Sequence, residues 1–379
     1  MNRYNVYIVL LLTDFIIGRW ALSFCQIHKE TDYYISSLLR YGTLMSHSST
    51  PEYLKNIQQC GFDIGFGKRT TGTQEWEQWH HYPDYGVVLT VQNLNNPMFG
   101  TNFALFGYMN GTFCEVSKFQ LQYQYGLGIA FWPVTYDPVD NPRNTYIGSH
   151  LTAYVDLALG IEYQLSKKID LFLRVNFCHS SNGATKLPNT GVNIIGGNIG
   201  LKYHINERKK PIHTLDTIEL FTPLNSLYFY IAPGLRESKL NHLYYLKSDI
   251  QIGYQRQFHP IFRFGAGLDF SFNGDISALF PPAEKNMLKC FRQSVFASFE
   301  VLYNRFVFHV SAGLYFNKSF GYYTPFYERA GVRFLLGKGK KHFIGVAIKA
   351  HGGSADFIEW TYGYQFFQWS DKKQNKIKL

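Results

Sequence analysis

Along much of the chain, apolar and polar residues alternate with a period of two. Between residues 119 and 131, every odd position is apolar or aromatic, while the even positions carry Gln, Gly or Ala. The same alternation returns in residues 151–165, 262–272 and 358–366. Because successive side chains of a β-strand point to opposite faces, these segments predict strands with one apolar and one polar face.

The length of these segments distinguishes between two classes of β protein. They run for about 9 to 15 residues, whereas strands of soluble proteins usually have about five or six. A tilted transmembrane strand needs about 9 to 11 residues. Aromatic residues also gather at segment ends, as at Phe131 and Trp132, which is typical of the girdles at membrane interfaces. The pattern therefore favours an outer-membrane barrel over a secreted β-sandwich.

The connections between the segments are alternately short and longer, with one long exception at residues 207–225. Transmembrane barrels have short periplasmic turns and longer extracellular loops. We predict an all-β fold, an antiparallel transmembrane β-barrel of about 16 strands, with about 12 as the lower bound. Residues 24–366 would form this single outer-membrane barrel domain, followed by a basic periplasmic tail at 367–379.

Composition excludes several other classes of protein. Of the 379 residues, 46% are hydrophobic, 18% aromatic and only 17% charged, which argues against disorder. After residue 24 no run of 18 apolar residues occurs, which excludes a helical membrane protein. The net charge of +10 is dispersed over turns and tail, so we expect a membrane-embedded protein with no nucleic acid partner.

Residues 1–23 predict a secretory signal peptide. Asn2 and Arg3 form a short basic start, an apolar stretch follows, and the segment ends in the small-residue pattern Ala21-Leu22-Ser23. A lipobox at Leu22-Ser23-Phe24-Cys25 and a buried N-terminal helix are the alternative interpretations. The five cysteines are scattered without a CxxC pair, so neither a disulfide framework nor a metal site is expected. The sequence predicts no cofactor.

One hairpin carries polar residues on its apolar face. The apolar parity of residues 169–177 continues into His179 and Ser181, and the return strand adds Asn193 to the same face. Polar groups that face hydrocarbon are costly, so such a cluster calls for a functional explanation. The other explanation is that the strands have already left the bilayer at His179. Parity alone does not decide between them.

The segment His179-Ser180-Ser181-Asn182-Gly183, followed by Pro-Asn-Thr-Gly at 188–191, resembles the active-site signature of the PagL-type lipid A 3-O-deacylases, especially their longer acyloxyacyl hydrolase-like members. The resemblance implies an outer-membrane barrel of a Gram-negative bacterium. It also implies a hydrolase that removes an ester-linked acyl chain from lipid A, from lipopolysaccharide or from a related glycolipid.

The resemblance also assigns roles by position. It implies Ser181 as nucleophile and His179 as general base, with Asn182, Gly183 and Asn189 as the oxyanion-binding groups. Residues two apart on a strand point the same way about 6.5 to 7 Å apart, which suits a serine and its base. The third catalytic residue of the family is a glutamate, but Asn193 stands here. Asparagine orients a histidine without offering it a negative charge.

A non-catalytic barrel, either a channel or a surface protein that retains the motif, is the alternative function. The inward parity of the predicted strands carries charged and polar residues, namely Arg174, Asp156, Glu162, Arg263, Asp269 and His309. In a barrel of 16 strands they would line a polar pore, and in a smaller barrel they would form a packed network. The sequence leaves the oligomeric state open.

Overall fold

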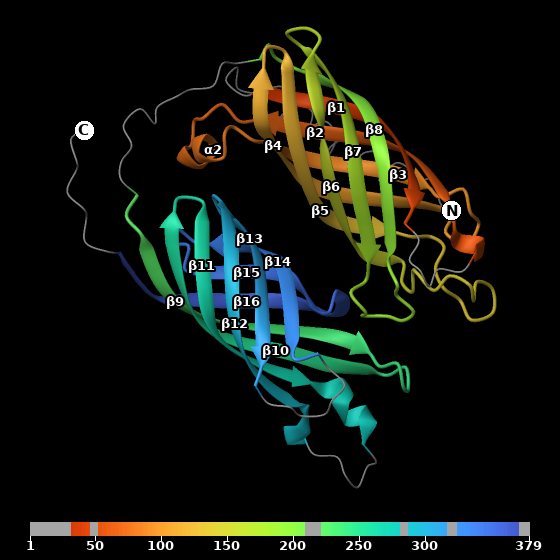
Figure 1. The fold of residues 1–379 in the computed structure, drawn as a ribbon, viewed down its shortest axis with the longest axis vertical. Coiled ribbons are helices and arrows are strands. Elements are labelled where there is room, and N and C mark those ends of the chain that lie inside the picture. The colour runs from red at the N-terminus through yellow and green to blue at the C-terminus, as the bar shows by residue number, and fades with distance from the viewer. Residues whose placement is uncertain (1–31, 46–51, 209–220, 281–286, 317–323, 371–379) are drawn as a thin grey trace, which may run out of the picture.

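The computed structural model describes residues 32–45, 52–208, 221–280, 287–316 and 324–370 (Figure 1). Strands dominate, and the helical segments are η1 (Glu52–Leu54), α2 (Glu75–Trp79), η2 (Gly274–Leu279) and η4 (Met287–Cys290). None of the helices in these ranges has the length and apolar character needed to span a membrane. The predicted signal peptide at 1–23 lies outside the described residues.

The strands close into two barrels of eight antiparallel strands each. The first barrel consists of β1 (Asp32–Leu44), β2 (Gln58–Arg69), β3 (Asp84–Asn93), β4 (Thr101–Val116), β5 (Phe119–Phe131), β6 (Leu151–Gln164), β7 (Ile169–Ser181) and β8 (Val192–His204). The second consists of β9 (Leu224–Glu237), β10 (Tyr244–His259), β11 (Phe262–Asn273), β12 (Phe291–Tyr303), β13 (Phe306–Tyr315), β14 (Phe326–Leu336), β15 (His342–His351) and β16 (Ser354–Ser370).

The antiparallel all-β class and the number of strands confirm the sequence prediction, but a single barrel at residues 24–366 is corrected to two. Strand β8 turns back to β1, with His204 opposite Tyr34, so the chain after β8 must begin a new sheet. Strand β16 closes the second barrel on β9, with Tyr362 opposite Ile231. The long connection that broke the alternation of loop lengths is the link between the two barrels.

The last strand extends further than its alternation predicts. A register shift between Gln365 and Phe367 changes the parity there, so the period-two pattern ends at Phe366. Pairing with β9 nevertheless continues to Ser370, opposite Leu224. The tail predicted to begin at residue 367 therefore begins with four residues of β16, and its remainder lies outside the described residues.

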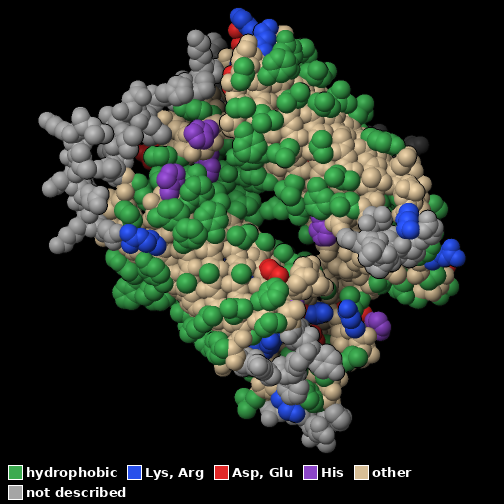
Figure 2. Space-filling view, in the orientation of Figure 1, with side chains coloured by type: hydrophobic (Ala, Val, Ile, Leu, Met, Phe, Trp, Pro, Cys, Tyr) green, Lys and Arg blue, Asp and Glu red, His purple; other side chains and the backbone are tan. Residues whose placement is uncertain are grey.

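Both barrels are apolar outside and polar inside. Leu173 and Val175 of β7 are exposed, whereas Arg174 and Asn176 between them are buried. The hydrophobic side chains cover the outer walls of both barrels in Figure 2. This distribution is that of a protein whose solvent is the hydrocarbon of a bilayer.

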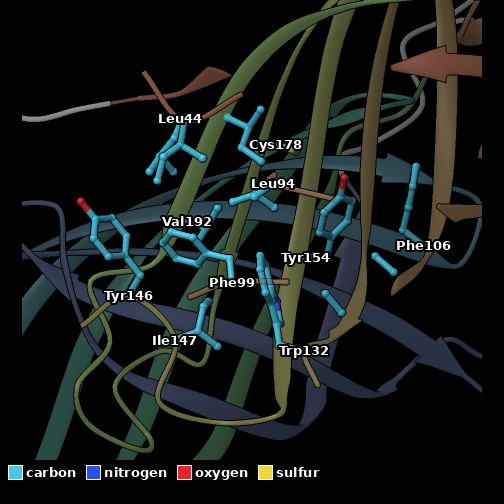
Figure 3. Packing of buried hydrophobic residues seen from close by; sticks show 14 of the residues in the cluster. Leu44, Leu94, Phe99, Phe106, Trp132, Tyr146, Ile147, Tyr154, Cys178 and Val192 are labelled. Carbon is cyan, nitrogen blue, oxygen red and sulfur yellow. The ribbon is translucent and has the colours of Figure 1, made fainter. Parts of the chain in front are cut away.

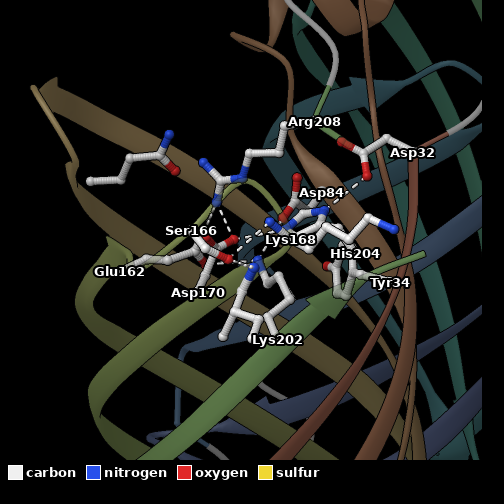
Figure 4. Close-up of polar contacts among 12 residues, drawn as sticks. Asp32, Tyr34, Asp84, Glu162, Ser166, Lys168, Asp170, Lys202, His204 and Arg208 are labelled. Atoms are coloured by element: carbon white, nitrogen blue, oxygen red, sulfur yellow. Dashed lines mark hydrogen bonds and ion pairs between the residues drawn. The ribbon is translucent and has the colours of Figure 1, made fainter. Parts of the chain in front are cut away.

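Ion pairs and hydrogen bonds fill the two interiors. In the first barrel, Lys202 contacts Asp84 at 2.9 Å and Glu162 at 2.7 Å (Figure 4). In the second, Arg329 contacts Asp269 at 2.9 Å and Glu359 at 2.7 Å. The six inward residues predicted from parity are all buried, namely Arg174, Asp156, Glu162, Arg263, Asp269 and His309. Five of them take part in hydrogen-bonded or ion-paired networks, as expected for barrels of eight strands. The buried ring of His309 has no hydrogen-bond partner among the described residues.

We call the end of each barrel at which β7 meets β8 and β15 meets β16 the loop end, and the opposite one the turn end. At the loop end of the first barrel, Phe99, Trp132, Tyr146, Ile147 and Val192 form a buried apolar cluster (Figure 3). These side chains come from three different connections or strand ends. The cluster therefore fixes the loops that surround the end of β7.

The two barrels contact each other at both ends. At the turn end, the Nε2–H of His80 donates to the carbonyl of Leu302 at 2.7 Å, and the His80 ring stacks on Tyr303. At the loop end, the backbone N–H of Leu187 donates to the carboxylate of Glu237 at 2.6 Å. The turn end of one barrel therefore contacts the turn end of the other, and the loop ends also contact each other, so the barrels lie side by side with their loop ends on the same side of the molecule.

Candidate active site

The polar residues that interrupt the apolar outer face lie where β7 and β8 meet. In the register of the two strands, His179 lies opposite Asn193. The Nδ1–H of His179 donates to Oδ1 of Asn193 at 2.6 Å. Since one ring nitrogen of a neutral imidazole donates and the other accepts, this bond leaves Nε2 as the proton acceptor.

Ser181 lies at the end of β7, two residues beyond His179 and on the same parity. Its side chain faces outward, yet the residue is only 8% exposed, because the loop at 182–191 folds over it. Its Oγ accepts a hydrogen bond from Nδ2 of Asn189 at 2.9 Å and another from the backbone N–H of Gly183 at 3.1 Å. Two N–H donors therefore converge on the serine oxygen.

The loop at 182–191 is held by its own polar contacts. The backbone N–H of Asn182 donates to Oδ1 of Asn189 at 3.1 Å, which turns the Nδ2 of Asn189 toward the serine. The side-chain Nδ2 of Asn182 donates to Oγ of Ser149 at 2.9 Å and to the carbonyl of Lys186 at 2.8 Å. The side chain of Asn182 thus braces the loop, while Gly183 and Asn189 present donors to Ser181.

Gly191 separates the imidazole from the serine. It has a φ of +78°, and a Cβ built on it would lie 2.9 Å from Cε1 of His179 and 3.3 Å from Cβ of Ser181. A side chain there would force both residues to move. The glycine therefore keeps open the space between them, a role beyond the turn chemistry that its sequence pattern indicates.

The structure brings the predicted site residues together but leaves one contact unmade. The two contacts of the Ser181 Oγ are with Asn189 and Gly183, and His179 is bonded to Asn193 instead. The adjacent serine is different in kind. Ser180 points into the barrel, where its Oγ accepts from the indole N–H of Trp132 at 3.0 Å and bonds Thr152 at 2.7 Å.

Several residues around the site could not be found by local pattern. Ser149 belongs to the preceding loop, and Glu237 belongs to the second barrel. Neither stands near the motif in the sequence, so only the folded chain places them there. Within the ranges that the structure describes, no group of three or more His, Cys, Asp or Glu side chains is arranged to hold a metal ion.

Comparisons with known proteins agree with this division of the chain. The model of the lipid A 3-O-deacylase (PagL) family matches residues 61–202, and that of the acyloxyacyl hydrolase C-terminal domain matches residues 225–369. The first match falls within the first barrel and the second within the second barrel. No match was found among curated proteins.

Two solved outer-membrane structures resemble parts of the chain. Neisserial surface protein A is 13% identical and covers 45% of this chain and 96% of its own, with a TM-score of 0.32. The outer membrane enzyme PagL is 15% identical and covers 47% of this chain and 99% of its own, with a TM-score of 0.31.

The fold and the family models define an outer-membrane β-barrel of the hydrolase class. Each barrel is thus matched by its own family model, the first by lipid A 3-O-deacylase (PagL) and the second by the acyloxyacyl hydrolase C-terminal domain. These matches confirm the resemblance carried by the motif around Ser181 and the predicted location in the outer membrane of a Gram-negative bacterium.

Proposed function

We propose that this protein is an outer-membrane esterase that removes an ester-linked acyl chain from lipid A or a related glycolipid, with Ser181 as nucleophile and His179 as general base. The observation that carries the proposal is the convergence of two N–H donors on the Oγ of Ser181, beside a histidine with an oriented ring. The match to the lipid A 3-O-deacylase family model supplies the substrate class.

The first step forms an acyl-enzyme. The Nε2 of His179 takes the proton from Ser181 as its Oγ attacks the ester carbonyl. The negative charge that develops on the carbonyl oxygen is stabilised by the N–H of Gly183 and the amide of Asn189, which are already in place. When the tetrahedral intermediate collapses, the protonated imidazole gives its proton to the departing sugar hydroxyl.

The second step releases the fatty acid. Water attacks the acyl-enzyme, His179 accepts the proton of that water, and Ser181 regains its proton as the carboxylic acid leaves. The missing hydrogen bond between His179 and Ser181 is compatible with these two reaction steps, because such bonds often tighten only when substrate is bound. The substrate ester would also displace the two donors from the serine oxygen onto its own carbonyl.

Asn193 orients the base in this proposal. Its amide oxygen holds Nδ1–H, which keeps Nε2 free to accept a proton. Unlike the glutamate of the family, it places no negative charge beside the imidazolium that forms during attack. We therefore expect turnover that is slower than with a carboxylate at this position.

The proposal is tested by comparing two neighbouring serines. Ser181→Ala, expressed in Gram-negative cells whose lipid A carries its full set of acyl chains, should leave lipid A unmodified. The control Ser180→Ala removes an equally small hydroxyl that faces the barrel interior, and it should keep the activity. Mass spectrometry of the extracted lipid A measures both. Deacylation by the Ser181→Ala protein would refute the proposed nucleophile.

A further inference from the structure

A slot lies between the outer walls of the two barrels, and one of its ends is at Ser181. At the loop end the barrels touch where Gly183 meets the second barrel, since a Cβ built on Gly183 would lie 2.5 Å from Ile358 and 2.9 Å from Ile348. Toward the turn end they touch where Tyr125 packs edge-on against Phe308, with ring centroids 5.0 Å apart. Figure 2 shows a hollow between the barrels.

The wall formed by the first barrel follows from strand register. Across β7, β6 and β5, Phe177 lies opposite Leu157, which lies opposite Tyr125. Two pairs closer to the loop end, in the next outward-facing row, His179 lies opposite Val155. The wall between the candidate site and the Tyr125 contact is thus entirely apolar, and Leu157 is still 45% exposed.

The facing wall is formed by β13 to β16 of the second barrel. Ile348 lies between Ile358 on β16 and Ala330 on β14. In the next row, Val346 lies opposite Val332, which lies opposite Phe308. Val346 is 43% exposed, so protein side chains do not fill the space in front of it. The slot therefore has two apolar walls and a protein contact at each end.

The carbonyl-binding group stands at the loop end of this slot. The N–H of Gly183 donates to Ser181, and the same residue touches Ile348 and Ile358. An ester carbonyl held by Gly183 would therefore have these isoleucines beside its acyl carbon. The sugar side of the ester needs a polar surface, whereas an acyl chain that leaves the site beside Ile348 and Ile358 enters the apolar slot.

We propose that the slot between the barrels binds the acyl chain that is cleaved, so that Ile348 and Ile358 of the second barrel form one wall of the substrate site. The inference rests on the proposed function and adds a role for the second barrel. Because lipid tails are as apolar as these side chains, the slot gains little from hydrophobicity and selects by shape. The walls should therefore set which chain lengths are accepted.

Filling the slot tests the inference. Val346→Trp and Leu157→Trp fill the slot from its two walls, one row beyond the residues that contact Gly183. Ile252→Trp is the control on β10, an outward position that is 50% exposed and lies on a strand that is not paired with either β15 or β16. Each protein is assayed in detergent with purified lipid A and with p-nitrophenyl butyrate, whose short chain does not reach this row.

The slot predicts at least a tenfold loss on lipid A for the two slot variants and less than a twofold change on the short ester. The control should match the wild type on both substrates. Retained short-ester activity also shows that the variants are folded. If the slot variants hydrolyse lipid A as fast as Ile252→Trp, the inference is overturned.

A widening variant and a nucleophile variant complete the test. Ile348→Ala should shift the chain-length preference toward longer or bulkier chains, and an unchanged profile would contradict the slot even if the tryptophan variants do not fold. Ser181→Ala should lose both activities. If it loses both while the slot variants behave like wild type, only the slot is refuted, whereas full activity in Ser181→Ala refutes the proposed function as well.

Discussion

The two barrels share an architecture but differ in what their outer walls carry. Both have eight strands, an apolar outside and an inside filled with ion pairs such as Arg40 with Asp63 and Arg329 with Asp269. Only the first barrel bears the imidazole, serine and amide cluster at the end of β7. The equivalent hairpin of the second barrel, β15 to β16, turns tightly through Gly352 and Gly353.

Under the proposed function, the chemistry is a property of one hairpin and its loop. A closed barrel satisfies every backbone hydrogen bond and needs only an apolar outside to be stable in a bilayer, which both barrels provide. A catalytic group is added where a strand end leaves the lipid and a loop supplies donors. The second barrel, whose corresponding hairpin turns tightly, contributes a wall and an anchor, Glu237, to the proposed site of the first.

Among the variants that compare the two barrels, removal of the proposed general base should have the largest effect. His179→Ala should reduce kcat/KM on lipid A by about 10³-fold or more, since the serine then lacks a proton acceptor. His342→Ala changes an exposed histidine of the second barrel and should have no effect. Equal activity in the two variants would remove the distinction between the barrels.

Loss of the loop amide should have the next largest effect. Asn189→Ala removes one of the two donors that converge on Ser181 and should lower kcat by about 10² to 10³-fold with little change in KM. Asn241→Ala, in the exposed loop after β9, is the matched control. A change confined to KM would show that Asn189 binds substrate without stabilising the transition state.

Introducing the family's glutamate should act in the opposite direction. Asn193→Glu places a carboxylate beside His179 and should raise kcat about tenfold, because about 1.4 kcal/mol of added stabilisation of the imidazolium in the transition state corresponds to that factor. Asn193→Ala should lower kcat, because the ring loses its partner at Nδ1. A slower Asn193→Glu enzyme would mean that the chain is adapted to asparagine. Steady-state kinetics across pH measures both.

Weakening the hydrogen bond between Glu237 of the second barrel and the loop at 182–191 should have the smallest effect. Glu237→Gln weakens the bond that holds the backbone of Leu187 and should cost about threefold to tenfold in kcat, since exchanging a charged acceptor for a neutral one weakens a hydrogen bond by about 1 kcal/mol. Hydrogen exchange should become faster in the 182–191 loop and stay unchanged in β7 and β8. Glu328→Gln, which alters a contact with Gly352, is the control. Unchanged exchange would argue against an anchoring role.

The outer and inner faces could be predicted from sequence because the alternation of apolar and polar residues within each strand indicates which side chains face outward. Leu173 and Val175 are exposed and Arg174 is buried, as the alternation requires. The motif also predicted which residues lie together at the candidate site, because His179, Ser181 and Asn193 share one parity on adjacent strands. These are local properties, and the period-two alternation of side chains along each strand is enough to predict them.

The remaining features depend on contacts between distant residues. Nothing near Tyr34 indicates that β1 pairs with β8 and closes a barrel early, although the long connection before β9 was the available signal. The burial of Ser181 and the contact of Gly183 with Ile348 and Ile358 arise only when loop and second barrel are in place. Alternation describes each wall but carries no information about which wall lies next to it.

The central claim is that Ser181, activated by His179, is the nucleophile of this protein. Incubation of the purified protein with a long-chain alkyl fluorophosphonate tests it directly, because an activated serine displaces fluoride and keeps the phosphonate on its Oγ. Peptide mass spectrometry should find the adduct on Ser181, absent in Ser181→Ala and formed at least about 100-fold more slowly in His179→Ala. An unlabelled Ser181, or labelling at the same rate without His179, would contradict the account.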